Sequence, residues 1–316
     1  MFTAVFLTDK KILITGASGF IGSNLAHRLA EIGVPSGSII APPHSECDLR
    51  VFSECERVLK GIDVVFHLAA VTGGIEFHQK NPGRIIYDNA AMGLNLLEAS
   101  RRAGVEKFIG IGSAAAYPRE APLPYREEDL WLDRSSDAIH FEYNFAKTLL
   151  LAQGQAYRRE FGFNAVYPVL TNVYGPGDSG QSGYVIPTLI RRIIQAKAQG
   201  LDAIEVWGTG RPTRDFLYVD DAVRGLMLVA ERYNRPEPIN LGSGREVSTK
   251  ELAETISRLM EFRGNIRWLT DKPDGQPRRL LDITRARSEL EFSPKVSLEE
   301  GLRRTIDWME KDFPAA

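Results

Sequence analysis

Short apolar runs alternate along the chain with longer stretches of helical periodicity. The runs Ile12–Ile14, 38–41 and 63–70 predict buried strands, because strands covered on both faces of a parallel sheet are almost continuously apolar. Residues 23–32 and 82–103 instead carry apolar side chains at the spacing of one helix face. The pattern therefore predicts strands and helices in alternation, beginning with a buried strand.

The later elements follow from the same periodicities and from turn residues. Residues 172–178 contain Gly175, Pro176 and Gly177 and are expected to form a loop. No internal repeat, low-complexity segment or compositional linker marks a domain boundary. Strands are expected over 107–113, 165–167, 204–208 and 239–244, the last ending in a turn, and helices over 140–161, 185–192, 220–233, 249–261 and 298–311.

Three glycines at three-residue spacing join the first strand to the first helix. Gly16, Gly19 and Gly22 can provide a tight turn, close approach to a pyrophosphate and close packing of helix on strand. The N-terminus of the helix offers N–H groups and a positive dipole end to phosphate. An ordinary glycine turn is the alternative, but the position between strand and helix favours a dinucleotide site. Its expected contacts are Gly16, Ser18, Gly19, Phe20, Ile21 and Gly22.

The second and third strands contribute further predicted cofactor contacts. After the second strand, an acidic residue would suit a ribose 2′-hydroxyl and an arginine a 2′-phosphate, but residues 42–44 are Pro-Pro-His. Asp48 and Leu49 are expected at the adenine edge, although Asp48 could instead cap the next helix. The third strand ends in Leu68, Ala69 and Ala70, where small side chains let a ligand lie against backbone. His67 is interpreted as a core histidine with one satisfied nitrogen.

Composition excludes several classes of function. The formal net charge of −2 gives no electrostatic basis for binding nucleic acid or an anionic membrane. Cys47 and Cys55, the only cysteines, form neither a disulfide framework nor a metal-ligand cluster, so a reduced, cytoplasmic protein without a bound metal is expected. No apolar run approaches the ~20 residues of a membrane span. Residues 1–7 are apolar but too short for a signal core.

A serine, a tyrosine and a lysine form the predicted catalytic set. Ser113 ends a strand, and Tyr143 and Lys147 follow at a spacing of four, on one face of a helix. A lysine snorkelling beside a half-buried tyrosine is the alternative. Free tyrosine, with a pKa near 10, is a poor base, but a nearby ammonium would lower that pKa towards neutrality. Ser113 could hold the reacting oxygen of an alcohol or ketone while hydride passes to or from a nicotinamide. Tyr143 and Lys147 are also expected to contact the cofactor, Lys147 at the nicotinamide ribose.

The ordered motifs resemble the extended short-chain dehydrogenase/reductase superfamily and, within it, the GDP-L-fucose synthase family. The resemblance implies an α/β fold: a Rossmann doubly wound parallel sheet with a smaller C-terminal α/β substrate domain, and a homodimer built on helices. The cofactor-binding domain would comprise residues 1–170 and about 214–246, and the substrate domain about 171–213 and 247–316. The resemblance rests on the glycine turn, Ser113, Tyr143, Lys147 and phrases at 67–70, 73–75, 172–176, 185–187, 206–210, 214–221 and 272–275.

The resemblance also implies a nucleotide-sugar site, with two departures from the family's pattern. Ala115 stands where the family has a cysteine, and Tyr184 where it has a histidine, the acid and base of epimerisation at sugar carbons 3 and 5. Epimerisation by that route is therefore expected to be disabled. The predicted substrate contacts are Ser113, Asn172, Arg192, Trp207, Arg214 and Lys272, the basic ones suiting a pyrophosphate.

Three functions remain open at this point. Epimerisation at C4 of a nucleotide sugar, GDP-linked for preference, with tightly bound NAD is favoured, because the arginines that would select NADP are missing. Reduction of a 4-keto sugar by NADPH is the alternative. A non-catalytic dinucleotide sensor is the third, and the retained Ser113, Tyr143 and Lys147 argue against it.

Overall fold

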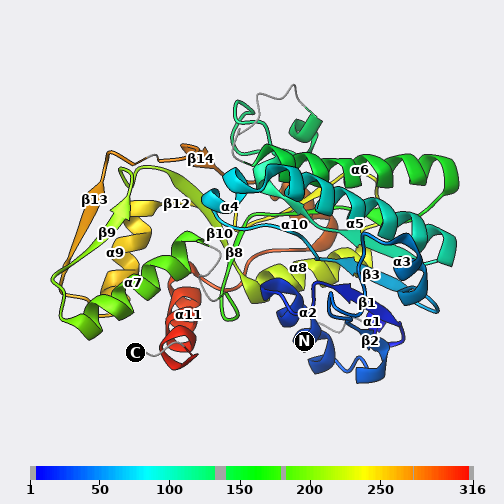
Figure 1. The fold of residues 1–316 in the computed structure, drawn as a ribbon, viewed down its shortest axis with the longest axis horizontal. Coiled ribbons are helices and arrows are strands. Elements are labelled where there is room, and N and C mark those ends of the chain that lie inside the picture. The colour runs from blue at the N-terminus through cyan, green and yellow to red at the C-terminus, as the bar shows by residue number, and fades with distance from the viewer. Residues whose placement is uncertain (1–4, 132–139, 179–182, 273, 313–316) are drawn as a thin grey trace.

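The computed structural model describes residues 5–131, 140–178, 183–272 and 274–312 (Figure 1). Its largest sheet is parallel throughout, with the strand order β2-β1-β3-β4-β6. Because parallel neighbours all point the same way, the carboxyl ends of these strands lie at one edge of the sheet. The strands are β1 (Ile12–Thr15), β2 (Ile39–Ile40), β3 (Val64–His67), β4 (Lys107–Gly110) and β6 (Ala165–Val166).

Two of these strands continue after single-residue breaks. Beyond Ile111, β5 (Gly112–Ser113) extends the path of β4, and beyond Tyr167, β7 (Pro168–Leu170) extends the path of β6. β5 pairs with β7, and β7 pairs with β11 (Ile239–Leu241), again in parallel. The continuation brings Ser113 to the same edge of the sheet as the end of β1.

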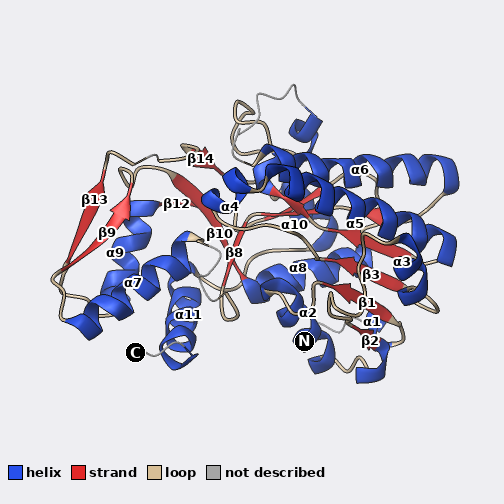
Figure 2. Cartoon of the chain, viewed as in Figure 1, coloured by secondary structure: helices blue, strands red, loops and turns tan. Residues whose placement is uncertain are grey.

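Helices cover both faces of the parallel sheet (Figure 2). In β1, Ile12 and Ile14 belong to one apolar cluster and Leu13 to another, as alternation along a strand requires. The first cluster includes α2 (Phe20–Glu31) and α8 (Val219–Arg232). The second includes α3 (Phe52–Val58), α5 (Pro82–Ala103) and α6 (Phe141–Phe161). Burial on both sides explains the continuous apolar runs in the sequence.

A second group of elements lies at the other end of the molecule (Figure 1). β10 (Thr213–Tyr218) pairs in parallel with β8 (Asn172–Tyr174) and β14 (Arg278–Arg279) and antiparallel with β12 (Glu246–Ser248). β9 (Ala203–Trp207) pairs with β13 (Asn265–Leu269). The helices α7 (Val185–Gln199), α9 (Thr249–Leu259) and α11 (Leu298–Asp312) pack together, while α10 (Thr284–Leu290) packs on β11 and α8.

The structure confirms the predicted fold class and nearly all predicted elements. The helix predicted over 82–103 has those bounds, and the strands predicted at 12–14 and 107–113 are present with small changes of length. The strand predicted over 63–70 is shorter, because β3 ends at His67. The short helices α1 (Val5–Thr8) and α4 (Ile75–Lys80) were not predicted. The division into a cofactor domain and a substrate domain stays a prediction.

Several predicted boundaries are wrong. α7 ends at Gln199 rather than at residue 192. α2 begins at Phe20 rather than at residue 23, because Gly19 already serves as its N-cap. Residues 172–174 form strand β8 rather than a loop, since they pair with residues 216–218 of β10. Pairing with a strand distant in sequence outweighs the local preference of the turn residues that follow.

Candidate active site

The glycine turn after β1 has the backbone geometry of a dinucleotide site. Gly16 has φ +73°, and a Cβ there would lie 2.7 Å from the backbone nitrogen of Ala69. A Cβ on Gly22 would collide with the carbonyl oxygen of Gly16. Gly19 donates its N–H to that same carbonyl at 3.0 Å and leaves the N-terminus of α2 without a side-chain cap. Ser18 is exposed in the turn, and Phe20 and Ile21 begin the helix. These residues fit a bound pyrophosphate.

A buried threonine joins the ends of β1 and β3. Thr15 Oγ1 accepts the N–H of Ala69 at 3.2 Å and hydrogen-bonds His67 Nδ1 at 2.9 Å. Burial lowers the pKa of His67 to about 3, and the charge of Lys147 adds to the effect. His67 is therefore a neutral core histidine, as predicted. Leu68 and Ala70 flank Ala69 at the half-buried end of the strand.

Asp48 is held by an arginine, so its predicted alternative role as a helix cap is wrong. Its carboxylate accepts the Arg50 guanidinium at 2.9 and 2.7 Å and the Arg50 backbone N–H at 3.0 Å. These bonds lower the pKa of Asp48 to about 2. α3 begins after Val51 with no side-chain cap. Leu49 is buried beside this pair, and the adenine contact of Asp48 and Leu49 stays a prediction.

Tyr143 and Lys147 share one face of α6, as their spacing predicts. Lys147 is 5% exposed, and its Nζ lies 5.7 Å from the centroid of the Tyr143 ring. Burial lowers the pKa of the ammonium to about 8. The pKa of Tyr143 is raised, first by burial and then by the neighbouring Tyr184. The expectation that the Tyr143 pKa is lowered towards neutrality is therefore wrong, because burial dominates and raises it overall.

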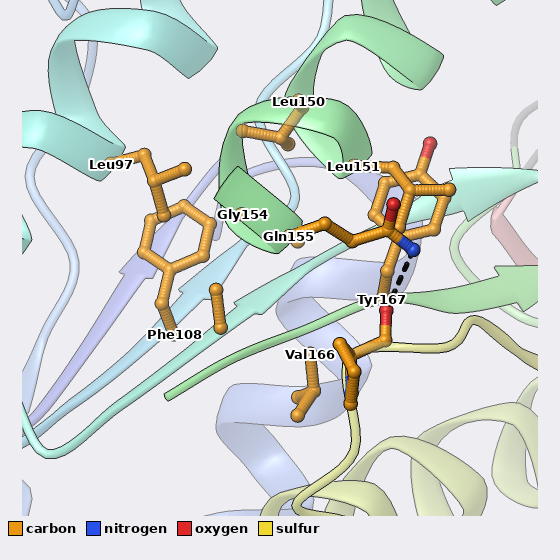
Figure 3. A pocket seen from close by; sticks show the side chains of 11 residues that line it. Leu97, Phe108, Leu150, Leu151, Gly154, Gln155, Val166 and Tyr167 are labelled. Atoms are coloured by element: carbon orange, nitrogen blue, oxygen red, sulfur yellow. Dashed lines mark hydrogen bonds between the residues drawn. The ribbon is translucent and has the colours of Figure 1, made fainter. Parts of the chain in front are cut away.

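The position of α6 depends on a tyrosine outside the predicted site. Tyr167 Oη donates to the carbonyl oxygen of Lys147 at 2.6 Å. Its ring covers Gly112, where a Cβ would collide with it. Figure 3 shows the Tyr167 ring beside Leu151 of α6. A glycine inside a strand is a signal of close approach, but it does not say which side chain approaches.

A second unpredicted residue connects the catalytic helix to the serine. Asn144 Nδ2 donates to the carbonyl oxygen of Ala115 at 2.6 Å. Ala115 belongs to the short 3-10 helix Ala114–Ala116, which Ser113 caps by accepting the Ala115 N–H at 3.2 Å. The structure therefore brings Ser113 and Tyr143 to neighbouring positions. The sequence signal was an asparagine inside a helix, where that residue type is neutral to unfavourable.

Arg192 and Trp207 line one groove between α7 and β9. Trp207 is 55% exposed at the end of β9, and the Arg192 guanidinium donates to the carbonyl oxygen of Glu205. The groove holds about 500 Å³ and also includes Gln195 and Arg267. The arrangement is suitable for stacking and charged contacts, and the roles of these residues in binding substrate stay predictions.

Asp274 contacts the residues that follow β9. Asp274 accepts the backbone N–H of Thr209 at 2.6 Å and its hydroxyl at 2.7 Å. A Cβ on Gly275 would lie 3.7 Å from the Arg214 guanidinium. Lys272 is half-exposed, 3.7 Å from Asp271. Asp274 and Gly275 thus lie between Thr209, two residues after Trp207, and Arg214.

Asn172 has a contact that competes with its predicted role. Its amide Nδ2 donates to the carbonyl oxygen of Asp215 at 3.0 Å, across the β8–β10 pair. The amide oxygen and the second N–H of Asn172 are the groups that could then contact a substrate. The predicted contact of Asn172 with substrate stays a prediction.

Two further properties concern the residues that the structure describes. Within them, no three histidine, cysteine, aspartate or glutamate side chains are grouped to hold a metal ion. None of the described helices is long and apolar enough to cross a membrane. Cys47 and Cys55 are both buried.

The parallel sheet, the glycine turn and the Ser-Tyr-Lys set define a short-chain dehydrogenase/reductase enzyme. The sequence pattern of the NAD dependent epimerase/dehydratase family matches residues 12–242, and the chain belongs to that family. The NAD(P) cofactor class and the enzymatic character of the chain follow from this membership.

Relatives cover nearly the whole chain. It is 36% identical to GDP-L-fucose synthase 1 of Arabidopsis thaliana over 97% of this chain and 95% of that protein. It is 38% identical to GDP-L-fucose synthase of Sinorhizobium fredii over 95% of this chain and 96% of that protein. A GDP-L-fucose synthetase from Naegleria fowleri, solved with NADP, has 27% identity and a TM-score of 0.84, covering 98% of this chain and 96% of that one.

The contact between Gly22 and Gly16 gives a direct test of the glycine turn. Alanine is about 1 kcal/mol better than glycine inside a helix, so Gly22→Ala should stabilise α2 if the position were ordinary. The collision with the Gly16 carbonyl should instead displace the turn and weaken NAD(P) binding about tenfold or more, measured by calorimetry. Gly37→Ala is the control, because nothing lies within 4 Å of a Cβ there. Unchanged binding in Gly22→Ala would contradict this account.

Proposed function

We propose that the protein reduces the C4 ketone of a GDP-linked 4-keto sugar with NAD(P)H. The observation that carries the proposal is that Ser113, Tyr143 and Lys147 lie close together where α6 packs on β5. This place is at the same edge of the sheet as the glycine turn. The GDP-L-fucose synthases that match almost the full chain support a GDP-linked substrate.

The protein's own residues would manage the proton and the geometry. The bound nicotinamide would supply the hydride. Tyr143 would donate its phenolic proton to the sugar oxygen, and burial keeps the phenol protonated, as a proton donor must be. The nearby Lys147 ammonium would stabilise the phenolate left behind, and Ser113 would hydrogen-bond the same sugar oxygen.

The environment of Tyr143 favours reduction over the C4 epimerase that the sequence favoured. An epimerase must begin by taking a proton from the sugar alcohol, which requires a phenolate. The raised pKa of Tyr143 opposes that first step and suits donation instead.

A C4 epimerase with tightly bound NAD is the second candidate, supported by the region after β2. Residues 41–44 include no arginine for a 2′-phosphate. Arg50, a little further on, is already bound to Asp48 and to Asp88 Oδ1 at 3.0 Å. These contacts favour NAD over NADP.

The proposal also includes a binding site for the nucleotide and an interface for a homodimer. Arg192, Trp207, Arg214 and Lys272 would bind the diphosphate and base, from the groove and turn described above. The exposed apolar side chains of α5 and α6 would be covered in a homodimer: Tyr87, Leu94, Phe141, Phe145 and Phe161.

Cofactor stoichiometry separates the candidates. Purified protein given a GDP-linked 4-keto-6-deoxyhexose should oxidise one NADPH or NADH for each ketone reduced, followed by absorbance and mass spectrometry. Interconversion of C4 epimers without added cofactor, by protein that retains NAD, would favour the epimerase. Binding without turnover of any nucleotide sugar would overturn both.

The charge of Lys147 predicts a pH dependence. Because its pKa lies at about 8, the ammonium is present below that pH and lost above it. The kcat for ketone reduction, measured between about pH 6 and 10, should therefore fall above about pH 8. Tyr143→Phe should lower kcat about a hundredfold or more at every pH while cofactor binding persists. A kcat that rises through this range would contradict the assignment of Tyr143 as the acid.

Ala115 and Tyr184 predict that carbons 3 and 5 keep their configuration. Alanine has no proton to exchange, and Tyr184 is a phenol whose pKa burial raises. In D2O the wild-type protein should therefore incorporate no deuterium at C3 or C5, measured by NMR of the product. The double variant Ala115→Cys with Tyr184→His should gain exchange, with the single variants as controls. Deuterium in the wild-type product would show that another acid and base are present.

A further inference from the structure

A line of polar side chains lies beside Tyr143. Thr72, in the segment after β3, has its Oγ1 3.1 Å from Nε2 of His78 in α4. Tyr184, directly before α7, lies beside Thr72, since the Thr72 hydroxyl is one of the groups that influence the pKa of its phenol. Thr72 is exposed and Tyr184 is 48% exposed, whereas His78 is 2% exposed. The line therefore runs from a buried imidazole to hydroxyl groups that a ligand can reach.

The same imidazole packs against the catalytic tyrosine. The His78 and Tyr143 rings meet edge to face, with centroids 5.9 Å apart. His140, one turn before Asn144 on the same helix, meets His78 with centroids 4.7 Å apart. The backbones of the two segments also approach, since a Cβ on Gly183 would lie 3.6 Å from Cα of Gly74. Thr72 and Tyr184 are thereby fixed relative to Tyr143.

We propose that Thr72 and Tyr184 form a hydroxyl-binding pair that orients the sugar through its C3 hydroxyl, with His78 as the positioning residue behind them. The proposal rests on the proposed function, which places the C4 oxygen at Tyr143. The C3 hydroxyl is the only hydroxyl on a carbon next to C4, because C5 carries the ring oxygen and the exocyclic carbon. A hydroxyl there can donate to one member of the pair and accept from the other.

The chemistry of the pair suits binding rather than proton abstraction from carbon. Thr72 has no basic form near neutrality, and the pKa of the Tyr184 phenol is raised overall, so neither hydroxyl is a ready base. The charge of Asp178 near Tyr184 further disfavours a phenolate there. His78 hydrogen-bonds Thr72 rather than reaching the sugar itself. The pair would therefore hold an oxygen in place while Tyr143 delivers its proton.

Threonine substitutions test this pair with little risk to the fold, because Thr72 is exposed. Thr72→Val removes the hydroxyl and keeps the shape, whereas Thr72→Ser keeps the hydroxyl. The probes are GDP-4-keto-6-deoxymannose and its 3-deoxy counterpart, with the reduced cofactor that the wild type uses. Thr72→Val and Tyr184→Phe should each raise the KM for the first probe about tenfold, which corresponds to the loss of one hydrogen bond. The KM for the 3-deoxy probe should change by less than about twofold. Thr72→Ser should resemble the wild type.

A double-mutant cycle completes the test. Because both side chains act on one hydroxyl, the Thr72→Val and Tyr184→Phe effects should be less than additive. His78→Leu should reproduce the Thr72→Val pattern, with thermal unfolding as a check on the fold. Equal losses on both probes, full additivity, or a wild-type KM in Thr72→Val would overturn the proposal. A wild-type protein that reduces neither probe would instead overturn the proposed function.

Discussion

The site depends on one costly feature, a lysine ammonium buried beside a phenol. Taking the charge of Lys147 out of water lowers its pKa to about 8, and no carboxylate contributes to that shift. Its charge in turn disfavours protonation of the buried His67, which Thr15 holds at the end of β1. The Tyr167 bond to the Lys147 carbonyl and the packing of α6 on the sheet fix the position of the helix that carries the lysine.

How much could be predicted from sequence depended on whether a contact is local. The Tyr143–Lys147 face and the Gly16–Gly22 turn come from residues a few positions apart, so spacing was sufficient. The Asn144–Ala115 and Tyr167–Lys147 bonds join segments that only the fold brings together. The pKa of Tyr143 was mispredicted for the same reason. Proximity to a lysine can be read from spacing, whereas burial is a property of the whole fold.

Strand β8 and Asp48 show the same limit in other forms. The residues of β8 have turn-forming neighbours, but six-residue β10 supplies an edge that they pair with. Asp48 had the sequence of a helix cap, yet Arg50 is close enough to bind it twice. In both cases a stronger partner was present, and a pattern of residue types cannot rank partners by strength.

The environment of Tyr143 connects the fold to the direction of the reaction. Tyr184 adds to the raised pKa of Tyr143, so the residue that departs from the family's histidine also favours a protonated phenol. A base at position 184 would serve exchange at carbon, whereas a phenol beside Thr72 would serve hydrogen bonding to a ligand. In the proposed function, the same substitution would remove one reaction and support another. Loss of the epimerisation residues would then be a change of specificity, since Ser113, Tyr143 and Lys147 stay close together at the edge of the sheet.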